Sequence, residues 1–271
     1  MKLAGVSSKQ SAVAAPAAEL SPVQTLHVAT YNIHKGMSMF NRRLVIHELR
    51  DKLRVLNADV VFLQEVLGTH RRHAGRHGDW PAEPQYEFLA DSVWHDFAYG
   101  RNAVYDAGHH GNAILSRFPI TRWDNQDISA HRFEQRGLLH CEIGVPGWKE
   151  PLHCVCVHLA LTSRGRSRQL ERLRQRIERL VPPDAPLVIA GDFNDWRYKA
   201  PWELACPLNL HEVFELIQGQ PARSFPAALP LFRLDRIYVR GFRVNRVRVH
   251  HGQSWRRISD HAALSTTLEM I

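Results

Sequence analysis

The chain has 271 residues, of which 44% are hydrophobic and 23% are charged, an ordinary composition for a globular protein of one large or two small domains. No apolar run approaches the ~20 residues needed to cross a bilayer, so a transmembrane helix is not expected. The formal net charge of +8 favours anionic partners, namely nucleic acid, phosphorylated small molecules or anionic lipid surfaces, although many basic proteins bind none of them.

The beginning of the chain differs in composition from the rest. Residues 1–23 are rich in Ala, Ser and Pro and lack the compact apolar core of a secretory signal. We therefore expect a disordered leader there, with export as the alternative. Residues 24–271 contain no linker and no internal repeat, and they are expected to form one domain.

Short apolar runs and one clear amphipathic pattern predict the elements that follow. Strands are expected, in chain order, at residues 26–31, 59–63, 111–116, 138–145, 152–157, 187–190, 234–239 and 262–268. Helices are expected over residues 42–56 and 163–180, the second stopped by Pro182-Pro183, and residues 68–84 are expected to be a long surface loop. The irregular spacing favours a mixed, layered α/β fold over a βαβ repeat.

The four cysteines indicate a reducing environment. Their spacing matches neither a disulfide framework nor a zinc cluster. We expect reduced thiols in the core of a cytoplasmic protein, and the residues concerned are Cys141, Cys154, Cys156 and Cys206.

The run from Leu187 to Asn194 carries the strongest sign of chemistry. A buried strand ends there in a glycine, a carboxylate and an amide, and strand alternation predicts that Asp192 and Asn194 point to the same side. Gly191 lets the backbone bend or lets a ligand approach. A carboxylate and an amide at a rigid strand end suit a hydrated metal or an anionic oxygen, which points to an enzyme.

Polar residues end several other predicted strands. Taken singly, each has an ordinary structural explanation, such as a turn cap or a surface ion pair, but strand ends are where open sheets gather catalytic groups. The full set is Asn32, Glu65, His158, Asp192, Asn194, Asp235, Asp260 and His261.

The order of these motifs resembles that of the endonuclease/exonuclease/phosphatase superfamily over roughly residues 26–270. The matching segments are Thr30-Tyr31-Asn32, Leu63-Gln64-Glu65, Gly111 to Pro119, Val157-His158-Leu159, Gly191-Asp192-Phe193-Asn194, Leu234 to Tyr238 and Ser259-Asp260-His261. The segments Asn32 to Gly36 and Gly108 to Asn112 are most similar to the bacterial YbhP-type subgroup.

This resemblance implies a DNase I-like four-layer α/β sandwich, in which two packed β-sheets are flanked by helices, with the site at one edge. It also implies attack of water on a phosphoester with Mg²⁺ or Mn²⁺, hard cations that prefer oxygen ligands. By resemblance, Glu65 is the main metal ligand, assisted by Asn32 and Asp260.

The resemblance also implies catalytic roles. His261 fits the general base, and Asp235 would orient its imidazole. Asp192 would orient the attacking water or serve the leaving group. Asn194 and His158 would donate hydrogen bonds to phosphoryl oxygens, and His158 could instead protonate the leaving oxygen; the sequence leaves this open.

Three further residues are expected at the substrate. Asn112 is a phosphate contact by resemblance, and Arg164 could reach a phosphate from the first turn of its helix. His34 stands where exonuclease-III-type abasic nucleases carry an acidic residue, which weakens the DNA-repair reading. For His109 and His110, a surface position and a place facing the substrate remain open alternatives.

The sequence therefore predicts a metal-dependent phosphodiesterase or endonuclease. A phospholipid or glycolipid head-group phosphodiesterase or phosphatase is the alternative, and a non-catalytic binding module on the same fold is the rival from another class. No aromatic-rich insertion with interleaved basic residues marks a base-stacking DNA clamp. A monomer without an obligate protein partner is expected, with peripheral contact to an anionic membrane as a possibility; the substrate and the number of metal ions stay open.

Overall fold

A computed structural model describes residues 22–38, 43–131 and 134–271. The expected leader lies outside the described residues except for Pro22 and Val23. The Val23 amide donates to the Pro146 carbonyl (3.0 Å), and the Trp148 indole donates to the Val23 carbonyl (2.8 Å). The chain is thus tied to the domain just before its first strand.

The strands form two six-stranded sheets. The first has the order β11-β12-β1-β2-β4-β3, with β1 (Thr25–Asn32), β2 (Val60–His70), β3 (Asp96–Tyr105), β4 (Gly108–Ser116), β11 (Phe242–His250) and β12 (Ala263–Met270). The second has the order β5-β6-β7-β8-β10-β9, with β5 (Ile120–Asp127), β6 (Gly137–Ile143), β7 (Leu152–His158), β8 (Leu187–Asp192), β9 (His211–Glu212) and β10 (Asp235–Arg240). In each sheet one neighbouring pair is parallel, β1 with β2 and β7 with β8.

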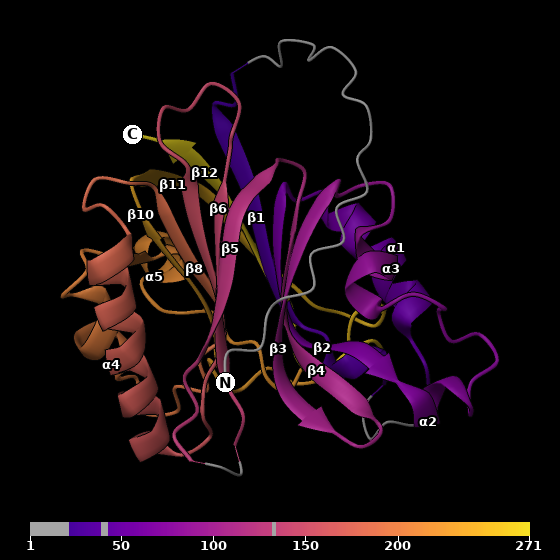
Figure 1. Cartoon of the computed structure of the whole chain (residues 1–271). Helices are drawn as coiled ribbons and strands as arrows, with labels where there is room; N and C mark the ends of the chain where they lie inside the picture. The colour runs from indigo at the N-terminus through magenta and orange to yellow at the C-terminus, as the bar shows by residue number, and fades with distance from the viewer. Residues whose placement is uncertain (1–21, 39–42, 132–133) are drawn as a thin grey trace, which may run out of the picture.

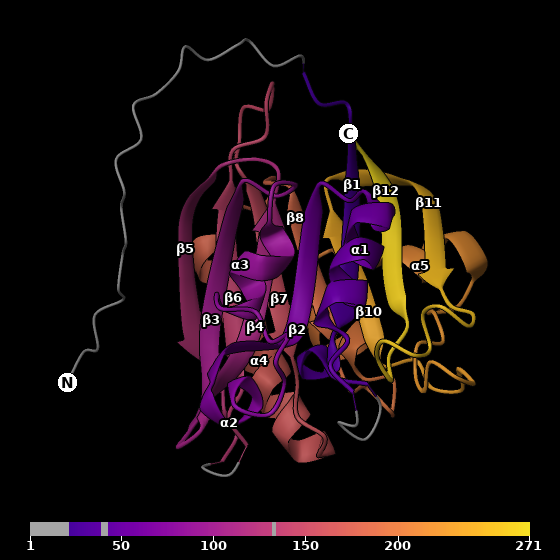
Figure 2. The same cartoon turned by 90° about the vertical axis from the view of Figure 1, so that its right-hand side faces the viewer.

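The sheets pack face to face between two helical layers (Figure 1), as the sequence predicts. Apolar side chains such as Phe62 and Ile237 fill the space between the sheets. Figure 2 shows α1 (Ile46–Leu56) and α3 (Gln85–Ala90) in front of the first sheet and α4 (Ser163–Leu180) behind the second. The helices of the first layer bury their inner face against the first sheet through residues such as Leu53 and Phe88. The inner face of α4 is buried through Leu173. The four-layer α/β sandwich is therefore confirmed.

The remaining helices are short. They are η1 (His34–Gly36), α2 (Arg71–Ala74), η3 (Pro201–Ala205) and α5 (Val213–Gln218). Among the described residues, no helix combines the length and apolar character that a membrane crossing requires.

Some predicted boundaries were wrong. The helix expected from Arg42 begins only at Ile46, because the chain before it is held extended by a bridge between Met37 and Leu44. The surface loop expected over residues 68–84 contains the end of β2 and all of α2. By contrast, α4 spans the predicted 163–180, with the Thr162 hydroxyl capping the Gly165 amide (3.2 Å).

The cysteines are free thiols, as expected, but only three of them are in the core. Cys141, Cys154 and Cys156 are buried, whereas Cys206 is exposed. Burial, the largest effect, raises the pKa of Cys156 to about 12. The buried thiols are therefore protonated packing groups.

Gly191 is required where β7 and β8 approach the site. Its φ is +146°, and a Cβ there would lie 1.9 Å from the Val157 carbonyl oxygen. Only glycine lets the strands pair closely enough to bring His158 opposite Asp192 in the register.

Candidate active site

The predicted residues gather at one end of the sandwich, where strand ends of both sheets meet. The first sheet supplies Asn32 at the end of β1, Glu65 within β2, Asn112 on β4, and Asp260 with His261 just before β12. The second supplies His158 at the end of β7, Asp192 at the end of β8 and Asp235 at the start of β10. The site therefore exists only while the two sheets are packed together.

Asp192 is the centre of this constellation. Its Oδ2 accepts a hydrogen bond from Asn32 Nδ2 (3.2 Å) and lies 3.5 Å from His158 Nε2 and 3.8 Å from His261 Nε2. Its Oδ1 accepts a hydrogen bond from the backbone amide of Asn194 (3.0 Å). Burial raises the pKa of Asp192 to about 7, so the carboxylate is poised to exchange a proton near neutrality.

His261 lies between two carboxylates. Its Nδ1 shares a 2.8 Å hydrogen bond with Asp235 Oδ2, and its Nε2 faces Asp192. Burial opposes a charge on the ring, but Asp235 and Asp192 outweigh it and raise the pKa of His261 to about 10. The two carboxylates favour an imidazolium that donates from Nδ1 to Asp235 and turns Nε2 toward Asp192 at 3.8 Å, beyond hydrogen-bond distance.

Glu65 and Asp260 each have a basic neighbour from η1. Lys35 Nζ lies 3.8 Å from Glu65 Oε2, and His34 Nδ1 lies 3.3 Å from Asp260 Oδ1. The hydrogen bond with Asp260 raises the pKa of His34, and it lowers that of Asp260 against the effect of burial. His34 thus contacts a predicted metal ligand.

The turn that carries His34 and Lys35 is conformationally strained. His34, Lys35 and Glu65 all have left-handed backbones, with φ values of 44°, 60° and 57°. Such values cost energy for residues other than glycine and persist where the surrounding structure holds them. Here the buried Gln85 side chain donates to the Lys35 carbonyl (2.8 Å) and accepts from the Leu67 amide (2.9 Å), which fixes the turn against β2.

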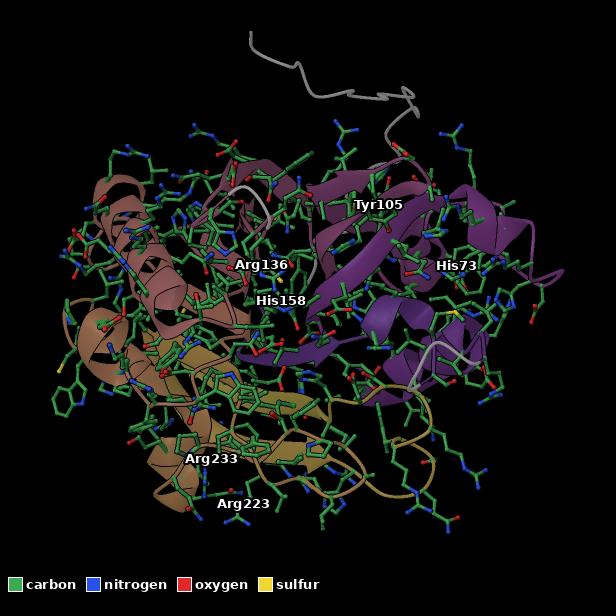
Figure 3. The ribbon with its side chains drawn as sticks, turned by 90° about the horizontal axis from the view of Figure 1, so that it is seen from below. His73, Tyr105, Arg136, His158, Arg223 and Arg233 are labelled. Carbon is green, nitrogen blue, oxygen red and sulfur yellow. The ribbon has the colours of Figure 1, made fainter. Side chains whose placement is uncertain are left out.

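His158 has a basic neighbour that no sequence motif indicated. Arg136 donates from Nε to the carbonyl of Leu159, the residue after His158 (3.3 Å). Figure 3 labels the side chains of Arg136 and His158 near each other. Burial, assisted by the charge of Arg136, holds the pKa of His158 well below its ordinary value. His158 is therefore neutral at physiological pH and suited to donate a hydrogen bond.

Two predicted amide residues donate to the protein's own backbone. Asn194, whose φ is 47°, does not continue the strand alternation, and its Nδ2 donates to the Leu159 carbonyl (3.1 Å). Asn112 Nδ2 donates to the carbonyls of Gly137 (3.1 Å) and Cys156 (3.3 Å) on the other sheet. Each side chain therefore has a structural task at the site.

The arginines at the start of α4 differ in environment. Arg164 is exposed in the first turn. Arg166 is buried and donates from Nη1 to the carbonyls of Ala160 (3.0 Å) and Leu161 (2.8 Å). Arg166 holds the chain that follows β7, whereas Arg164 is free to meet a ligand from solvent.

His109 and His110, whose positions the sequence left undecided, lie on β4 near the site. His109 Nδ1 shares a 3.0 Å hydrogen bond with the Tyr99 hydroxyl. His110 is close enough to Lys35 and Glu65 for both charges to affect its pKa, which burial lowers to about 4. Of the two, His110 is the one that faces the site.

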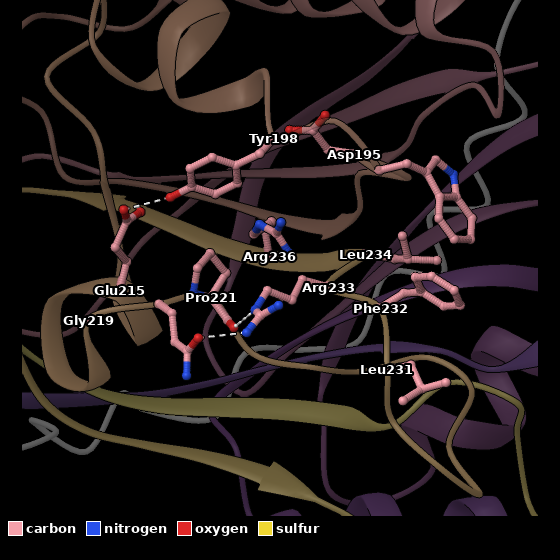
Figure 4. A pocket seen from close by; sticks show the side chains of 12 residues that line it. Asp195, Tyr198, Glu215, Gly219, Pro221, Leu231, Phe232, Arg233, Leu234 and Arg236 are labelled. Carbon is pink, nitrogen blue, oxygen red and sulfur yellow. Dashed lines mark hydrogen bonds between the residues drawn. The ribbon is translucent and has the colours of Figure 1, made fainter.

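Figure 4 shows a cavity of about 500 Å³ whose lining includes chain neighbours of the site residues. Asp195 and Leu234, which line it, adjoin Asn194 and Asp235 in the chain. Its walls also include Trp196 and Phe232, whose rings are 4.9 Å apart. Phe225 connects this wall to the site, with ring centroids 4.9 Å from His261 and 6.4 Å from Trp196.

The donor set fits a hard divalent cation. Carboxylate oxygens dominate, and Asp235 Oδ1 is buried without a hydrogen-bond partner among the described residues. Ligand atoms of Asp192, Asp235 and His261 all lie within 4.8 Å of one another. Glu65 and Asp260, the predicted ligands, face the same end of the sandwich but are not part of that triad.

Comparisons with known proteins agree with this geometry. The model of the Endonuclease/Exonuclease/phosphatase family matches residues 29–261. The uncharacterised protein YbhP of Escherichia coli K12 is 48% identical over 243 residues, which cover 90% of this chain and 96% of YbhP.

Solved structures share the fold at low identity. An endonuclease/exonuclease/phosphatase from Beutenbergia cavernae has a TM-score of 0.69 at 20% identity, covering 92% of this chain and 72% of that one. TDP2 of D. rerio, complexed with a single strand DNA product, has a TM-score of 0.68 at 20% identity, covering 92% of this chain and 100% of that one. At such identity these two similarities bear on the fold alone.

Proposed function

The chain belongs to the endonuclease/exonuclease/phosphatase family, and from this premise we propose that it is a divalent-metal-dependent phosphodiesterase or endonuclease. Family membership itself indicates hydrolysis of phosphoester bonds. The observation that carries the finer proposal is the position of Asp192 Oδ2, within 3.2 to 3.8 Å of Asn32, His158 and His261.

We assign proton transfer to Asp192 rather than to His261. A general base must have a free acceptor, and His261, with Asp235 hydrogen-bonded at Nδ1 and Asp192 3.8 Å from Nε2, is favoured in its charged form, which has no lone pair to accept a proton. Asp192 would take the proton of the attacking water. His261, held by Asp235, would stabilise the negative charge that develops on the phosphoryl oxygens.

The neutral His158 would add a hydrogen bond to the same oxygens. A group with a depressed pKa is a poor proton donor to a leaving oxygen at neutral pH, so the stabilising role is favoured over the acid role. Arg136 and Lys35 would supply positive charge at the rim, where the substrate phosphate enters. Arg164 would complete the set of proposed contacts, whereas Asn194 and Asn112 would support the site through their hydrogen bonds to backbone carbonyls.

Mg²⁺ or Mn²⁺ would be held by Glu65 and Asp260 with the amide oxygen of Asn32. When bound, it would polarise the phosphoryl group and lower the pKa of a bound water. The role of the chain is then to present these oxygens and to balance their charge with Lys35 and His34.

Two other readings compete with this one. A phospholipid or glycolipid head group would fit the same phosphoester chemistry, and the net charge of +8 suits an anionic membrane as well as nucleic acid. A non-catalytic module is disfavoured because every predicted catalytic residue is retained at the site.

Hydrolysis of bis(p-nitrophenyl) phosphate tests the proposal. Turnover with Mg²⁺ or Mn²⁺ should disappear with EDTA and in Glu65→Gln, whereas the exposed Glu83→Gln should behave as the parent protein. Full activity in EDTA would refute the metal requirement, and absence of turnover on every phosphoester offered would favour the binding module. Cleavage of oligonucleotides, measured against head-group release from liposomes, separates the two substrate classes.

The free, buried thiols support a reducing compartment, and we propose the cytoplasm as the location. A monomer acting on a phosphoester without an obligate protein partner is the simplest arrangement, with peripheral contact to an anionic membrane as the lipid alternative.

A further inference from the structure

A row of aromatic rings leads away from the candidate active site. It starts at His110, continues through Tyr105 and His70 to His73, and ends at Trp80. Successive ring centroids are separated by 5.8, 5.7, 3.9 and 5.4 Å, and the last two rings are within 10° of parallel. We call these five residues the ring row. Figure 3 labels Tyr105 and His73 on the same side of His158.

The ring row is built into the fold rather than carried on a loose loop. His70 Nδ1 accepts from the His73 amide (3.2 Å) and so caps α2. The amide and the guanidinium of Arg71 donate to the carbonyls of Ala107 (2.8 Å) and Asp106 (2.9 Å) in the β3–β4 turn. A Cβ at Gly108 would lie 1.8 Å from the Thr69 carbonyl oxygen, so glycine permits the close approach of this turn to β2.

The rings are uncharged and lie next to positive charge. Burial lowers the pKa of His70, and that of His73 to about 4, so both imidazoles are neutral at physiological pH. Arg72 and Arg76 are exposed on and just after α2. Lys35 stands at the inner end of the ring row.

The acidic side chains on this face are fewer. Asp79 and Asp106 are exposed near α2. Glu65, whose charge acts on Tyr105 and His110, is the third acidic group. The four basic residues Lys35, Arg71, Arg72 and Arg76 outnumber these three, so an anionic chain passing along the ring row meets a net positive surface.

We propose that the ring row is a stacking surface for the unpaired bases of a single-stranded nucleic acid whose scissile phosphate lies at Asp192. The inference rests on the proposed function and names its substrate class. Stacking on rings with basic side chains along the backbone is how single strands are held without reading sequence. Bases in a duplex have no free faces, so a double strand would not use these rings. An acyl chain would prefer aliphatic side chains to imidazoles with polar edges.

Binding in EDTA tests the inference without turnover. The full chain is titrated into a fluorescein-labelled 15-nucleotide single strand at low salt, and fluorescence anisotropy gives the Kd. Tyr105, whose side chain is exposed, is the variant of choice because its loss removes a ring without opening the core. Tyr105→Ala should raise the Kd roughly tenfold, and Tyr105→Phe should restore it, since one base–ring stack accounts for about that factor.

Trp123→Ala is the matched control, because that indole is also exposed (48%, against 38% for Tyr105) and lies on β5 at the edge of the other sheet. It should leave the Kd unchanged. An equal loss in Trp123→Ala, no loss in Tyr105→Ala, or tighter binding of the matching duplex would overturn the proposal. So would binding to phosphatidylglycerol vesicles that depends on Tyr105 while the oligonucleotide does not bind.

The outcome is distinguishable from that of the proposed function. Turnover of bis(p-nitrophenyl) phosphate by the parent protein without oligonucleotide binding rejects the ring row and keeps the enzyme. Oligonucleotide binding through Tyr105 without any phosphoester turnover keeps the ring row and rejects the enzyme.

Discussion

Lys35 Nζ lies 3.8 Å from Glu65 Oε2, so the carboxylate predicted to bind the metal already has a cation beside it. Both residues have left-handed backbones, and Gln85 holds the Lys35 turn in place. The protein thus maintains a strained segment in order to keep an ammonium group at this point of the site. Sequence reasoning passed over Lys35 because a single lysine after the Asn32 motif carries no spacing signal.

Replacing Lys35 by methionine should separate two effects. Mn²⁺ should bind about two- to fivefold more tightly, because the substitution removes a partly exposed positive charge that lies beside Glu65 and repels the cation. The KM for a phosphodiester should rise at least roughly tenfold, because a charge-assisted contact to phosphate is lost. Calorimetry and steady-state kinetics measure the two changes, with the exposed Lys149→Met as control. Unchanged KM would show that Lys35 only balances Glu65.

Replacing Asp192 by asparagine should abolish function without weakening the fold. Turnover should fall by ~10²–10⁴-fold, because the proton acceptor is lost. The thermal midpoint should change little, since the substitution removes a carboxylate whose pKa is raised by burial but loses one of the hydrogen bonds accepted from Asn32 and Asn194. Asp184→Asn, in the exposed turn after α4, is the control. A large drop in the midpoint would instead assign Asp192 a structural role.

Asn112 joins the two sheets and should matter for stability. Asn112→Ala leaves the carbonyls of Gly137 and Cys156 without their donor, which should lower the free energy of unfolding by about 2 kcal/mol. Urea titration measures this, and the exposed Asn245→Ala should change it little. A loss of activity with unchanged stability would favour the phosphate contact that the resemblance implies.

The buried His140 should make the fold sensitive to acid. Burial, with His153 at 3.0 Å, lowers the pKa of His140 to about 3, whereas in the unfolded chain it is about 6.5. Between these values the unfolded chain binds the extra proton, so stability is present above about pH 6.5 and falls as the pH drops, by up to about 1.4 kcal/mol per pH unit.

Urea titrations from pH 7.5 to 4.5 measure this slope. His140→Gln keeps a polar side chain without a titrating ring and should reduce the slope, the remainder coming from His73 and His110, whose pKa values burial also lowers. The exposed His95→Gln should not. An unchanged slope in His140→Gln would assign the acid sensitivity to other groups.

The sequence predicted best what depends on local pattern. The periodicity of α4 and the apolar run of β8 specify those elements almost without neighbours. The strands β3, β5, β9 and β11 were missed, and they are the edge strands of the two sheets. The exposed faces of β5 and β11 are polar, which hides the apolar pattern of a strand. The start of α1 was misplaced because a tertiary bridge, not a capping residue, determines it.

At the site, motif order singled out residues that lie together in the fold, but it did not predict the contacts between them. That Asp192 and Asn194 share a turn rather than a strand face depends on the left-handed backbone of Asn194. Arg136 and the ring row depend on segments brought together only by folding, so no linear pattern reveals them. Physical proximity across sheets is the information that one sequence lacks.

The division of the site between two sheets has a consequence for how the protein would lose activity. Neither sheet holds enough chemistry to act alone, because the hydrogen bonds from Asn32 to Asp192 and from His261 to Asp235 both cross the interior. Turnover would then fall whenever the two sheets shift relative to each other, even while the secondary structure stays intact.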